Sequence, residues 1–495
     1  MKERLRYFIK GLALVIVLGG LLSLFNWVLT PKYLYNQDWP TTSTYLGFYG
    51  MERDTVDVLF LGSSHAMSAF SPQEIYDAYG LRTYNLGSEQ QSGFISYYWL
   101  KEALRYQSPK AVVLDTCFFF KRNTEPLNSG EAFVRKALDF MKWSPVKLEA
   151  VQAIRNLDTK QSRMSYFFPN IRYHSRWTDL QEEDMPFSQM ASHTELKGFT
   201  IRNGRSGEKG YEPFEKDSDH DSAIALDWLM EEYLRKIAEL CKARGISLIL
   251  VKTPTHSMRI GHYNTICSFA QENGIDYYDF NEKTLYEEAN LDFQNDMDDF
   301  THLNYLGARK ISRWIGKILT EKYRIDSVYD EQWERTKAFC EASLSNAGLQ
   351  YITDAAEYLN TLNTERNTVF IATKDFTTEH LNNEMLDAMH RLGLDEMLEN
   401  QSQNCHYAVL SQTHAEEGSD EQFIEAQGLV REEKTMYRMS CAGFDYGNAC
   451  SIQIDGIECA QNRRGINIVV YDNALNSVVD SVCIDIHVPQ LTVMR

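Results

Sequence analysis

The segment VDVLFLGSSH, residues 56–65, decides which fold we expect for this chain. An apolar run ends at Gly62, and three polar residues, Ser63-Ser64-His65, follow it directly. A short apolar run that is closed by a glycine turn predicts a buried strand over residues 56–62. In a parallel sheet, Ser64 then lies at the carboxyl edge, where open α/β sheets bind their ligands.

Four more apolar runs follow along the chain, and helical patterns separate them. We expect the further strands at residues 82–87, 111–115, 246–254 and 275–280, and helices at residues 71–79, 94–106, 225–245 and 303–323. Strands that alternate with helices indicate βαβ units and a parallel sheet. Because the strands are almost continuously apolar, helices should cover both faces of the sheet. We therefore predict a three-layer α/β/α domain over residues 54–325.

An uncharged segment of 19 residues, Gly11 to Leu29, precedes this domain. A helix of that length spans about 28 Å, close to the hydrocarbon thickness of a bilayer. Four basic residues precede the segment, and positive flanks stay on the cytoplasmic side. We therefore expect residues 1–30 to form a single-pass membrane anchor, with the main domains outside the cytoplasm. A cleaved signal peptide and a buried helix are the alternatives, but the run does not end in a small-residue cleavage site.

The composition limits the class of protein. The chain has 495 residues and a formal net charge of −19, so we expect no binding to nucleic acid, which needs clustered positive charge. Hydrophobic residues make up 43% and charged residues 24%, which excludes a disordered or polytopic membrane protein. Nine cysteines are too few for a disulfide scaffold in a chain of this length.

The sequence changes in character after the α/β pattern. Residues 326–365 are charged and partly helical in pattern, and we interpret them as a linker. From residue 366 to residue 495, strand-like runs between turn residues predict a smaller domain of mixed, β-rich structure. Five cysteines fall in this domain, so it can form at most two disulfides and leaves one free thiol; they are Cys405, Cys441, Cys450, Cys459 and Cys483.

A second polar motif, Asp299-Phe300-Thr301-His302, lies between the last strand and the last helix of the α/β pattern. Asp299 and His302 are three positions apart on a loop, so the carboxylate can orient the imidazole. The other ring nitrogen can then accept the proton of a serine hydroxyl. The sequence therefore predicts a catalytic triad with Ser64 as nucleophile, His302 as base and Asp299 as the residue that orients it.

Other interpretations of these motifs stay open. Ser63 is the nucleophile if the turn is shifted by one residue. His65 either forms hydrogen bonds in the first helical turn or contacts substrate. The carboxylates of Asp296, Asp298 and Asp299 suggest a metal site, but no His or Cys at a ligand spacing supports it. We therefore expect neither a metal nor a cofactor.

The two motifs, in this order, resemble those of the SGNH/GDSL hydrolase family. VLFLGSSH resembles its first block, with Ser64 in the nucleophile position, and DFTH, residues 299–302, resembles its D-x-x-H block. YNLG, residues 84–87, resembles the second block, which implies that the N–H groups of Gly87 and Ser64 bind the oxyanion. After AVVLD, residues 111–115, the sequence TCFFF departs from the third block, G-x-N-D, and lacks its side-chain amide.

Membrane-anchored members of the family with such a reduced third block handle acyl groups destined for cell-envelope polymers. The resemblance therefore implies a serine esterase or O-acyltransferase whose substrate is a cell-surface glycan or an acylated polymer. It also implies a membrane-bound O-acyltransferase as a partner. One alternative is a non-catalytic glycan-binding or assembly protein that retains the scaffold. Another is a lipase-like enzyme that uses its anchor to meet lipid substrates.

The C-terminal sequence resembles a second family, the interleukin-like EMT inducer (ILEI) domain. AGFDYGN, IQIDG and RGINIVVYD stand in that order within residues 442–472. The resemblance covers about residues 367–487 and implies a domain that binds glycan and carries no catalytic residues. A β-rich cap without a ligand of its own is the alternative, because a fold alone does not assign a function.

Overall fold

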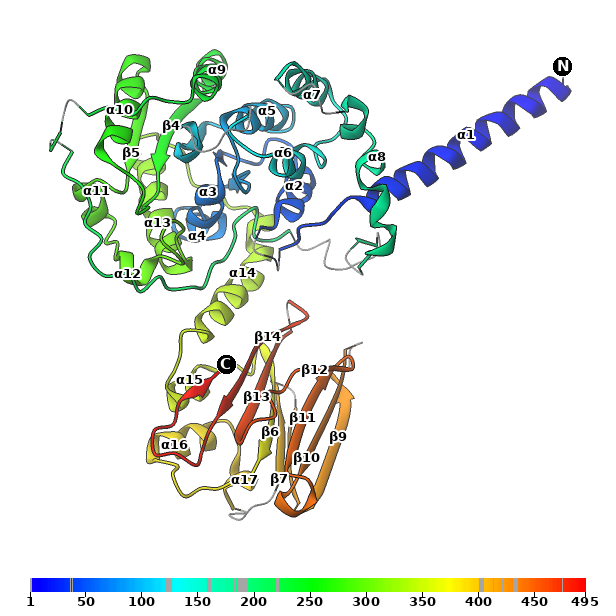
Figure 1. Ribbon diagram of the computed structural model, residues 1–495, viewed down its shortest axis with the longest axis vertical. Helices are drawn as coiled ribbons and strands as arrows, with labels where there is room; N and C mark the ends of the chain where they lie inside the picture. The colour runs from blue at the N-terminus through cyan, green and yellow to red at the C-terminus, as the bar shows by residue number, and fades with distance from the viewer. Residues whose placement is uncertain are drawn as a thin grey trace. The chain divides into compact units, whose positions relative to one another are not determined.

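The computed structural model describes most of the chain. It covers residues 2–495 apart from positions 36, 38, 121–126, 158–161, 182–183, 186–193, 217, 220–221, 400–404, 413, 421, 431–434 and 474, and apart from the side chains of residues 2–3 and 155–157. The chain divides into two compact units, Met1–Lys337 and Ala338–Arg495. Figure 1 shows the α/β elements of the first unit and the strands of the second.

A five-stranded parallel sheet forms the centre of the first unit, which confirms the predicted α/β class. The strand order is β2-β1-β3-β4-β5, so the order reverses between β1 and β3. In an open α/β sheet, such a reversal leaves a crevice at the carboxyl ends of the strands. The strands are β1 (Val58–Leu61), β2 (Thr83–Asn85), β3 (Ala111–Asp115), β4 (Ser247–Lys252) and β5 (Asp276–Asp279).

Helices cover both faces of this sheet, as its apolar strands predicted. Successive side chains of a strand point to opposite faces, so Leu59 and Phe60 of β1 lie in separate apolar cores. The core around Leu59 includes side chains of α5 (Gly93–Ala103), α9 (Trp228–Arg244) and α10 (Ile260–Asn273). The core around Phe60 includes side chains of α3 (Ser64–Ala69), α4 (Pro72–Tyr79), α12 (Phe293–Asp296) and α13 (Tyr305–Glu321), and α11 (Lys283–Glu288) packs against it.

The N-terminal segment forms a helix, α1 (Lys2–Leu29), and Figure 1 shows it projecting from the rest of the first unit. Its part from Arg4 to Leu29 is long and apolar enough to cross a membrane, a property that a signal sequence shares. The next helix, α2 (Thr41–Gly50), had not been predicted. It belongs to the core of the unit, because Tyr45 stacks on Trp99 with 4.0 Å between the ring centroids.

A long insertion separates β3 from β4, and its sequence has no clear periodicity. It contains short helical pieces, which pack onto α1, α2, α5 and α9 or onto one another. The described pieces are the 3₁₀ helices Cys117–Phe119, Arg163–Tyr166 and His174–Thr178 and the α-helices α6 (Glu131–Leu138), α7 (Pro145–Leu157) and α8 (Asn170–Tyr173).

The segment that we interpreted as a linker, residues 326–365, contains α14 (Glu331–Leu349) and α15 (Ala355–Thr361). Trp333, near the start of α14, lies in the apolar core of the first unit. Tyr358 of α15 lies in the core of the second unit. The boundary between the units therefore falls inside α14, and both helices contribute to packing.

The second unit is built from antiparallel strands, which confirms the predicted β-rich character. Its six-stranded sheet has the order β15-β14-β13-β6-β7-β8, and its four-stranded sheet has the order β12-β11-β10-β9. The strands are β6 (Asn367–Lys374), β7 (Cys405–Leu410), β8 (Ala415–Asp420), β9 (Phe423–Leu429), β10 (Met436–Ala442), β11 (Ala449–Ile454), β12 (Ile457–Glu458), β13 (Gly465–Asp472), β14 (Ser477–Ile484) and β15 (Val493–Met494).

Two cores hold this unit together. One face of the larger sheet packs on α15, α16 (Asn383–Arg391) and α17 (Asp395–Glu399), and the other face packs on the smaller sheet. Four of these strands, β8 to β10 and β15, lie outside the strand-like runs of the sequence and had not been predicted. β8 reads AEEGSD and is largely solvent-accessible, so it carries no apolar signal. All nine cysteines of the chain are free thiols in this structure.

His406 of β7 is a buried titratable residue in the second unit. Its ring is fully buried and packs edge-on against Phe376, with 4.7 Å between the centroids. Within the described residues neither ring nitrogen has a hydrogen-bond partner, and burial lowers the pKa of His406 to about 4. An unfolded histidine titrates near pH 6.5. Between these two pH values the unfolded chain therefore binds a proton that the folded unit does not.

We predict that the free energy of unfolding of this unit falls as the pH is lowered from 6.5 to 4, with a contribution from His406 of up to about 3 kcal/mol. His406→Phe should remove this part of the pH dependence, because phenylalanine fits an apolar site and does not titrate. Denaturant unfolding at several pH values measures it. Substitution of the exposed His390 serves as the control. An equal pH dependence of the free energy of unfolding in wild type and His406→Phe would contradict the assignment of this dependence to His406.

Candidate active site

The turn that leaves β1 requires a glycine. Gly62 has φ +138°, a backbone region that side chains rarely adopt. A Cβ atom at this position would lie 2.5 Å from Cβ of Asp115, on the neighbouring strand. The turn places Ser63 at the N-cap of α3 and Ser64 as the first residue of that helix. Ser64 thus lies at the carboxyl edge of the sheet, beside the reversal of strand order.

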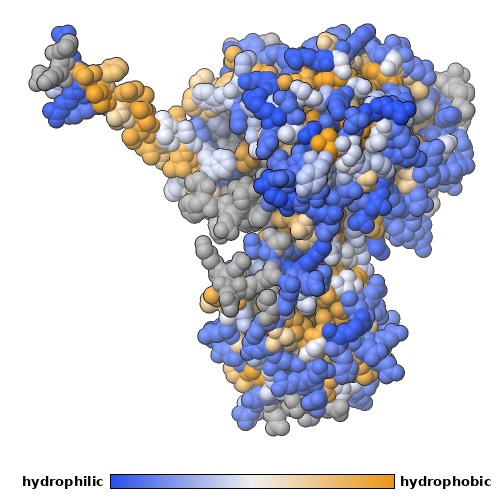
Figure 2. Space-filling view, turned by 180° about the vertical axis from the view of Figure 1, so that it is seen from behind, coloured by the Kyte–Doolittle hydropathy of each residue, from blue (hydrophilic) through white to orange (hydrophobic). Residues whose placement is uncertain are grey.

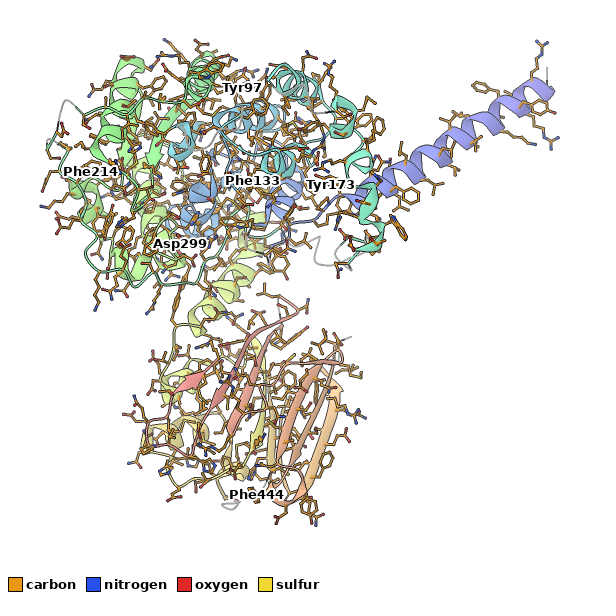
Figure 3. All side chains as sticks on the ribbon, viewed as in Figure 1. Tyr97, Phe133, Tyr173, Phe214, Asp299 and Phe444 are labelled. Carbon is orange, nitrogen blue, oxygen red and sulfur yellow. The ribbon has the colours of Figure 1, made fainter. Side chains whose placement is uncertain are left out.

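The structure brings the three predicted triad residues together. Ser64 Oγ lies 2.9 Å from Nε2 of His302, although 238 positions separate the two residues in sequence. Nδ1 of His302 lies 2.9 Å from Oδ2 of Asp299, which Figure 3 labels. A carboxylate only accepts hydrogen bonds, so Nδ1 carries the proton and Nε2 can accept the hydrogen of Ser64. This is the arrangement that activates a serine hydroxyl for nucleophilic attack.

The loop before α13 keeps the carboxylate of Asp299 charged. Burial by itself raises the pKa of a carboxyl group, but hydrogen bonds from His302 and Thr301 outweigh it and hold the pKa of Asp299 well below its usual range. Oδ1 accepts the backbone N–H groups of Thr301 (2.7 Å) and His302 (2.8 Å). It also accepts the hydroxyl of Thr301 at 2.9 Å. The carboxylate therefore has a fixed orientation toward the imidazole.

Ser63, the alternative nucleophile, is placed differently. It is fully buried, and its hydroxyl donates to Oδ2 of Asp115 at 2.9 Å. Its oxygen also accepts the backbone N–H of His65 at 3.3 Å. These contacts give Ser63 a role in fixing the turn, whereas Ser64 is the serine that contacts His302.

His65 lies beneath the triad. It is buried, and its Nδ1 lies 3.1 Å from the hydroxyl of Thr253 and 3.4 Å from Nζ of Lys252. Its ring centroid is 5.1 Å from that of His302. His65 therefore packs behind the base, as expected of a hydrogen-bonded residue in the first helical turn.

Gly87 differs from what the resemblance implied. Its backbone N–H donates to Oδ1 of Asn85 at 3.0 Å, so it is not available to an oxyanion in this conformation. The N–H of Ser64, by contrast, has no acceptor within the described part of the chain. Other side-chain amides nearby bind backbone carbonyls: Asn85 binds those of Ala66 and Phe70, and Gln91 binds that of Leu86. Ser64 is thus the one predicted oxyanion donor that the structure leaves free.

The carboxylates that suggested a metal site have separate partners. Asp296 pairs with Lys310 at 2.7 Å, and burial raises its pKa. Asp298 pairs with Arg202 at 2.5 Å and accepts the N–H of Gly204 at 2.6 Å. Asp299 faces His302. These contacts do not draw the three carboxylates around a common point.

Three residues near the triad, Trp39, Arg202 and Asp115, were not predicted from the sequence. The ring of Trp39 packs edge-on against His302, with 5.6 Å between the centroids, and Arg202 lies over Trp39 at 4.4 Å. Trp39 comes from the segment just after α1, where no pattern points to the site. Asp115, which holds Ser63, had a weak signal, since a carboxylate that ends a buried strand lies at the ligand-binding edge.

A cavity of about 340 Å³ opens at the ends of β3 and β4. Its wall is connected to the site through Lys252, whose Nζ lies 3.4 Å from Nδ1 of His65, the residue after Ser64. Cavities of this size hold small organic ligands. Its lining combines apolar side chains with a buried ammonium group, hydroxyls and an imidazole: Thr116, Cys117, Phe120, Lys252, Ser257, Met258 and His262.

Comparison with known proteins does not place the chain in a family. No family model matches it, and no curated protein matches it. The site is therefore defined by its own geometry, in which Ser64, His302 and Asp299 form a continuous hydrogen-bonded series.

We predict that a serine-directed fluorophosphonate modifies Ser64. Ser64→Ala should abolish the adduct, because the replaced oxygen is the one within reach of His302. Ser63→Ala should retain labelling within about tenfold of wild type, since it changes the support of the turn and leaves the Ser64 hydroxyl in place. Peptide mass spectrometry locates the adduct, and thermal unfolding checks that both variants fold. Labelling that survives in Ser64→Ala and disappears in Ser63→Ala would reverse the assignment.

Proposed function

We propose that this protein is a membrane-anchored serine esterase or O-acyltransferase of the SGNH type, acting outside the cytoplasm on a cell-envelope glycan or polymer. The observation that carries the proposal is the 2.9 Å contact between Ser64 Oγ and His302 Nε2, with Asp299 on the other side of the ring. An imidazole held between a serine and a carboxylate is the basis of acyl transfer in many folds.

In the proposed reaction, Ser64 Oγ attacks the carbonyl carbon of an acyl ester while Nε2 of His302 takes the hydroxyl proton. The carbonyl oxygen becomes an oxyanion, and the N–H of Ser64, which has no acceptor among the described residues, is the donor that we propose for it. When the tetrahedral intermediate collapses, His302 returns the proton to the departing alcohol and an acyl-serine remains. A sugar hydroxyl or water, deprotonated by His302, then attacks the carbonyl carbon of the acyl-serine. As the bond to Ser64 Oγ breaks, His302 returns the proton to this oxygen and the acylated sugar or the free acid leaves. Asp299 stabilises the imidazolium form in both halves of the reaction.

Transfer rather than hydrolysis is favoured by the anchor helix and by the family resemblance. The cavity at the ends of β3 and β4 has room for a small acyl group, and its wall residue Lys252 contacts His65, the residue after Ser64. The resemblance of the second unit to the ILEI domain supports glycan as the acceptor, because a tethered binding domain raises the effective concentration of a polymer near the site. A membrane-bound O-acyltransferase is the proposed partner that supplies acyl groups.

The second candidate function is a non-catalytic glycan-binding or assembly protein that keeps the scaffold. A specific observation favours it, since the N–H of Gly87 is bound by Asn85 and the side-chain amide of the family's third block is missing. Loss of one oxyanion donor typically costs a factor of about 10²–10³ in rate. Reactivity of Ser64 separates the two candidates, because a binding protein needs no activated serine.

We predict that Asp299→Asn lowers the rate constant for fluorophosphonate labelling of Ser64 by on the order of 10³–10⁴, because the amide no longer holds the reactive tautomer of His302. The matched control is Asp292→Asn. Asp292 caps α12 and does not contact the triad. Because asparagine also caps helices, labelling should stay near the wild-type rate. Labelling reactions quenched at a series of times and analysed by mass spectrometry give the rate constants. Equal rates in wild type and Asp299→Asn would favour the non-catalytic protein.

A further inference from the structure

Large apolar side chains are exposed on the insertion between β3 and β4. They lie just before and within α7, in the 3₁₀ helices Arg163–Tyr166 and His174–Thr178, and in α8. We call this set the apolar collar; its members and exposed fractions are Trp143 (64%), Leu148 (56%), Met164 (53%), Ile171 (47%) and Trp177 (71%). Contiguous exposed apolar surface on a folded protein generally marks a contact with a partner or a membrane.

The segments that carry Ile171 and Trp177 are hydrogen-bonded to the last turn of α1. The N–H of Asn170 donates to Oδ1 of Asn26 at 3.1 Å. The guanidinium of Arg176, next to Trp177 in the chain, donates to the backbone carbonyl of Leu29 at 2.9 Å. Tyr173 is labelled in Figure 3 and lies beside the base of α1. The collar therefore lies level with the end of the apolar helix.

The remaining collar residues join this region through packed rings and helices. Trp143 contacts Phe167 and Phe168 edge-on, with centroid distances of 5.8 and 5.2 Å. α7 packs on the 3₁₀ helix that carries Met164, and this helix packs on α8. Arg176 is also held by Asp184 at 2.9 Å. The exposed rings are thus presented by one packed layer.

The position of the end of α1 determines how deep this layer would lie relative to the membrane. The apolar run Gly11–Leu29 matches the thickness of the hydrocarbon core, so its final turn would emerge at the membrane surface. Figure 2 shows α1 as a hydrophobic projection with a hydrophilic free end. Tryptophan is enriched at the level of lipid headgroups, where its ring is apolar and its N–H remains hydrated. Lys142 and Arg172 are exposed and lie next to collar residues in the chain. Their charged groups could remain at the polar headgroup level of the membrane.

We propose that the apolar collar docks into the outer surface of the membrane that α1 crosses and thereby holds the first unit against the lipid. The partner is the lipid surface, because the collar is continuous with the helix that enters it. The proposal rests on α1 as a membrane span and is independent of whether Ser64 is catalytic. Docking gives the unit a fixed orientation, with the collar toward the membrane.

The test uses full-length protein in nanodiscs whose lipids carry bromine atoms on the acyl chains close to the headgroups. Bromine quenches the fluorescence of tryptophan at short range. We expect Trp143→Phe and Trp177→Phe each to lower the fraction of emission that brominated lipid quenches. The matched control is Trp228→Phe at the start of α9, because Trp228 is equally exposed (70%) and lies outside the collar. Phenylalanine preserves the apolar packing, so the variants should fold.

Trp27→Phe reports separately on α1, because Trp27 lies in its last turns. If Trp27→Phe lowers the quenched fraction and the collar variants behave like Trp228→Phe, α1 is inserted and lipid docking of the collar is wrong. If Trp27→Phe and the collar variants all behave like Trp228→Phe, the anchor fails and the proposal fails with it. Shielding of the collar in native membranes but not in nanodiscs would identify a protein as the occupant and also overturn the proposal.

Discussion

The hydrogen bond between Ser64 and His302 depends on two helices that bring distant parts of the chain together. Ser64 begins α3, and His302 lies just before α13. Ser312 of α13 joins them, because its hydroxyl donates to the carbonyl of Ala69 at 3.1 Å and accepts the N–H of Ser71 at 2.9 Å. The contact is buried, so its polar groups must be paired for the fold to be stable. The packing of the helices therefore determines the geometry of the site.

The sequence predicted those parts of the fold whose signal is local. β1 and β3 are fully buried, so their apolar runs stand out, and α9 and α13 have clear turn or cap residues. Elements stabilised mainly by distant contacts were missed. α2 depends on the stacking of Tyr45 on Trp99. The polar strand β8 depends on its pairing with β7, and the residues of β8 alone do not predict this pairing.

The same difference between local and distant contacts explains which parts of the site could be predicted. Asp299 and His302 are three residues apart, so their contact follows from the loop alone and could be predicted. Trp39 reaches His302 from a remote segment, and no spacing predicts it. The N–H of Gly87 donates to the side chain of Asn85, and the motif YNLG does not indicate this contact. Sequence motifs thus identify residues that act together locally, whereas the direction of each hydrogen bond depends on tertiary structure.

The position of Trp39 connects the anchor with the site. Roughly ten residues separate it from the end of α1 at Leu29, and an extended chain covers about 35 Å at most over that length. His302 packs against Trp39. If α1 spans the membrane, this tether limits how far the triad can lie from the bilayer surface. In the function that we propose, a short tether and a docked collar would both restrict the orientations of the unit, and this restriction would raise the effective concentration of a membrane-bound acyl donor at Ser64.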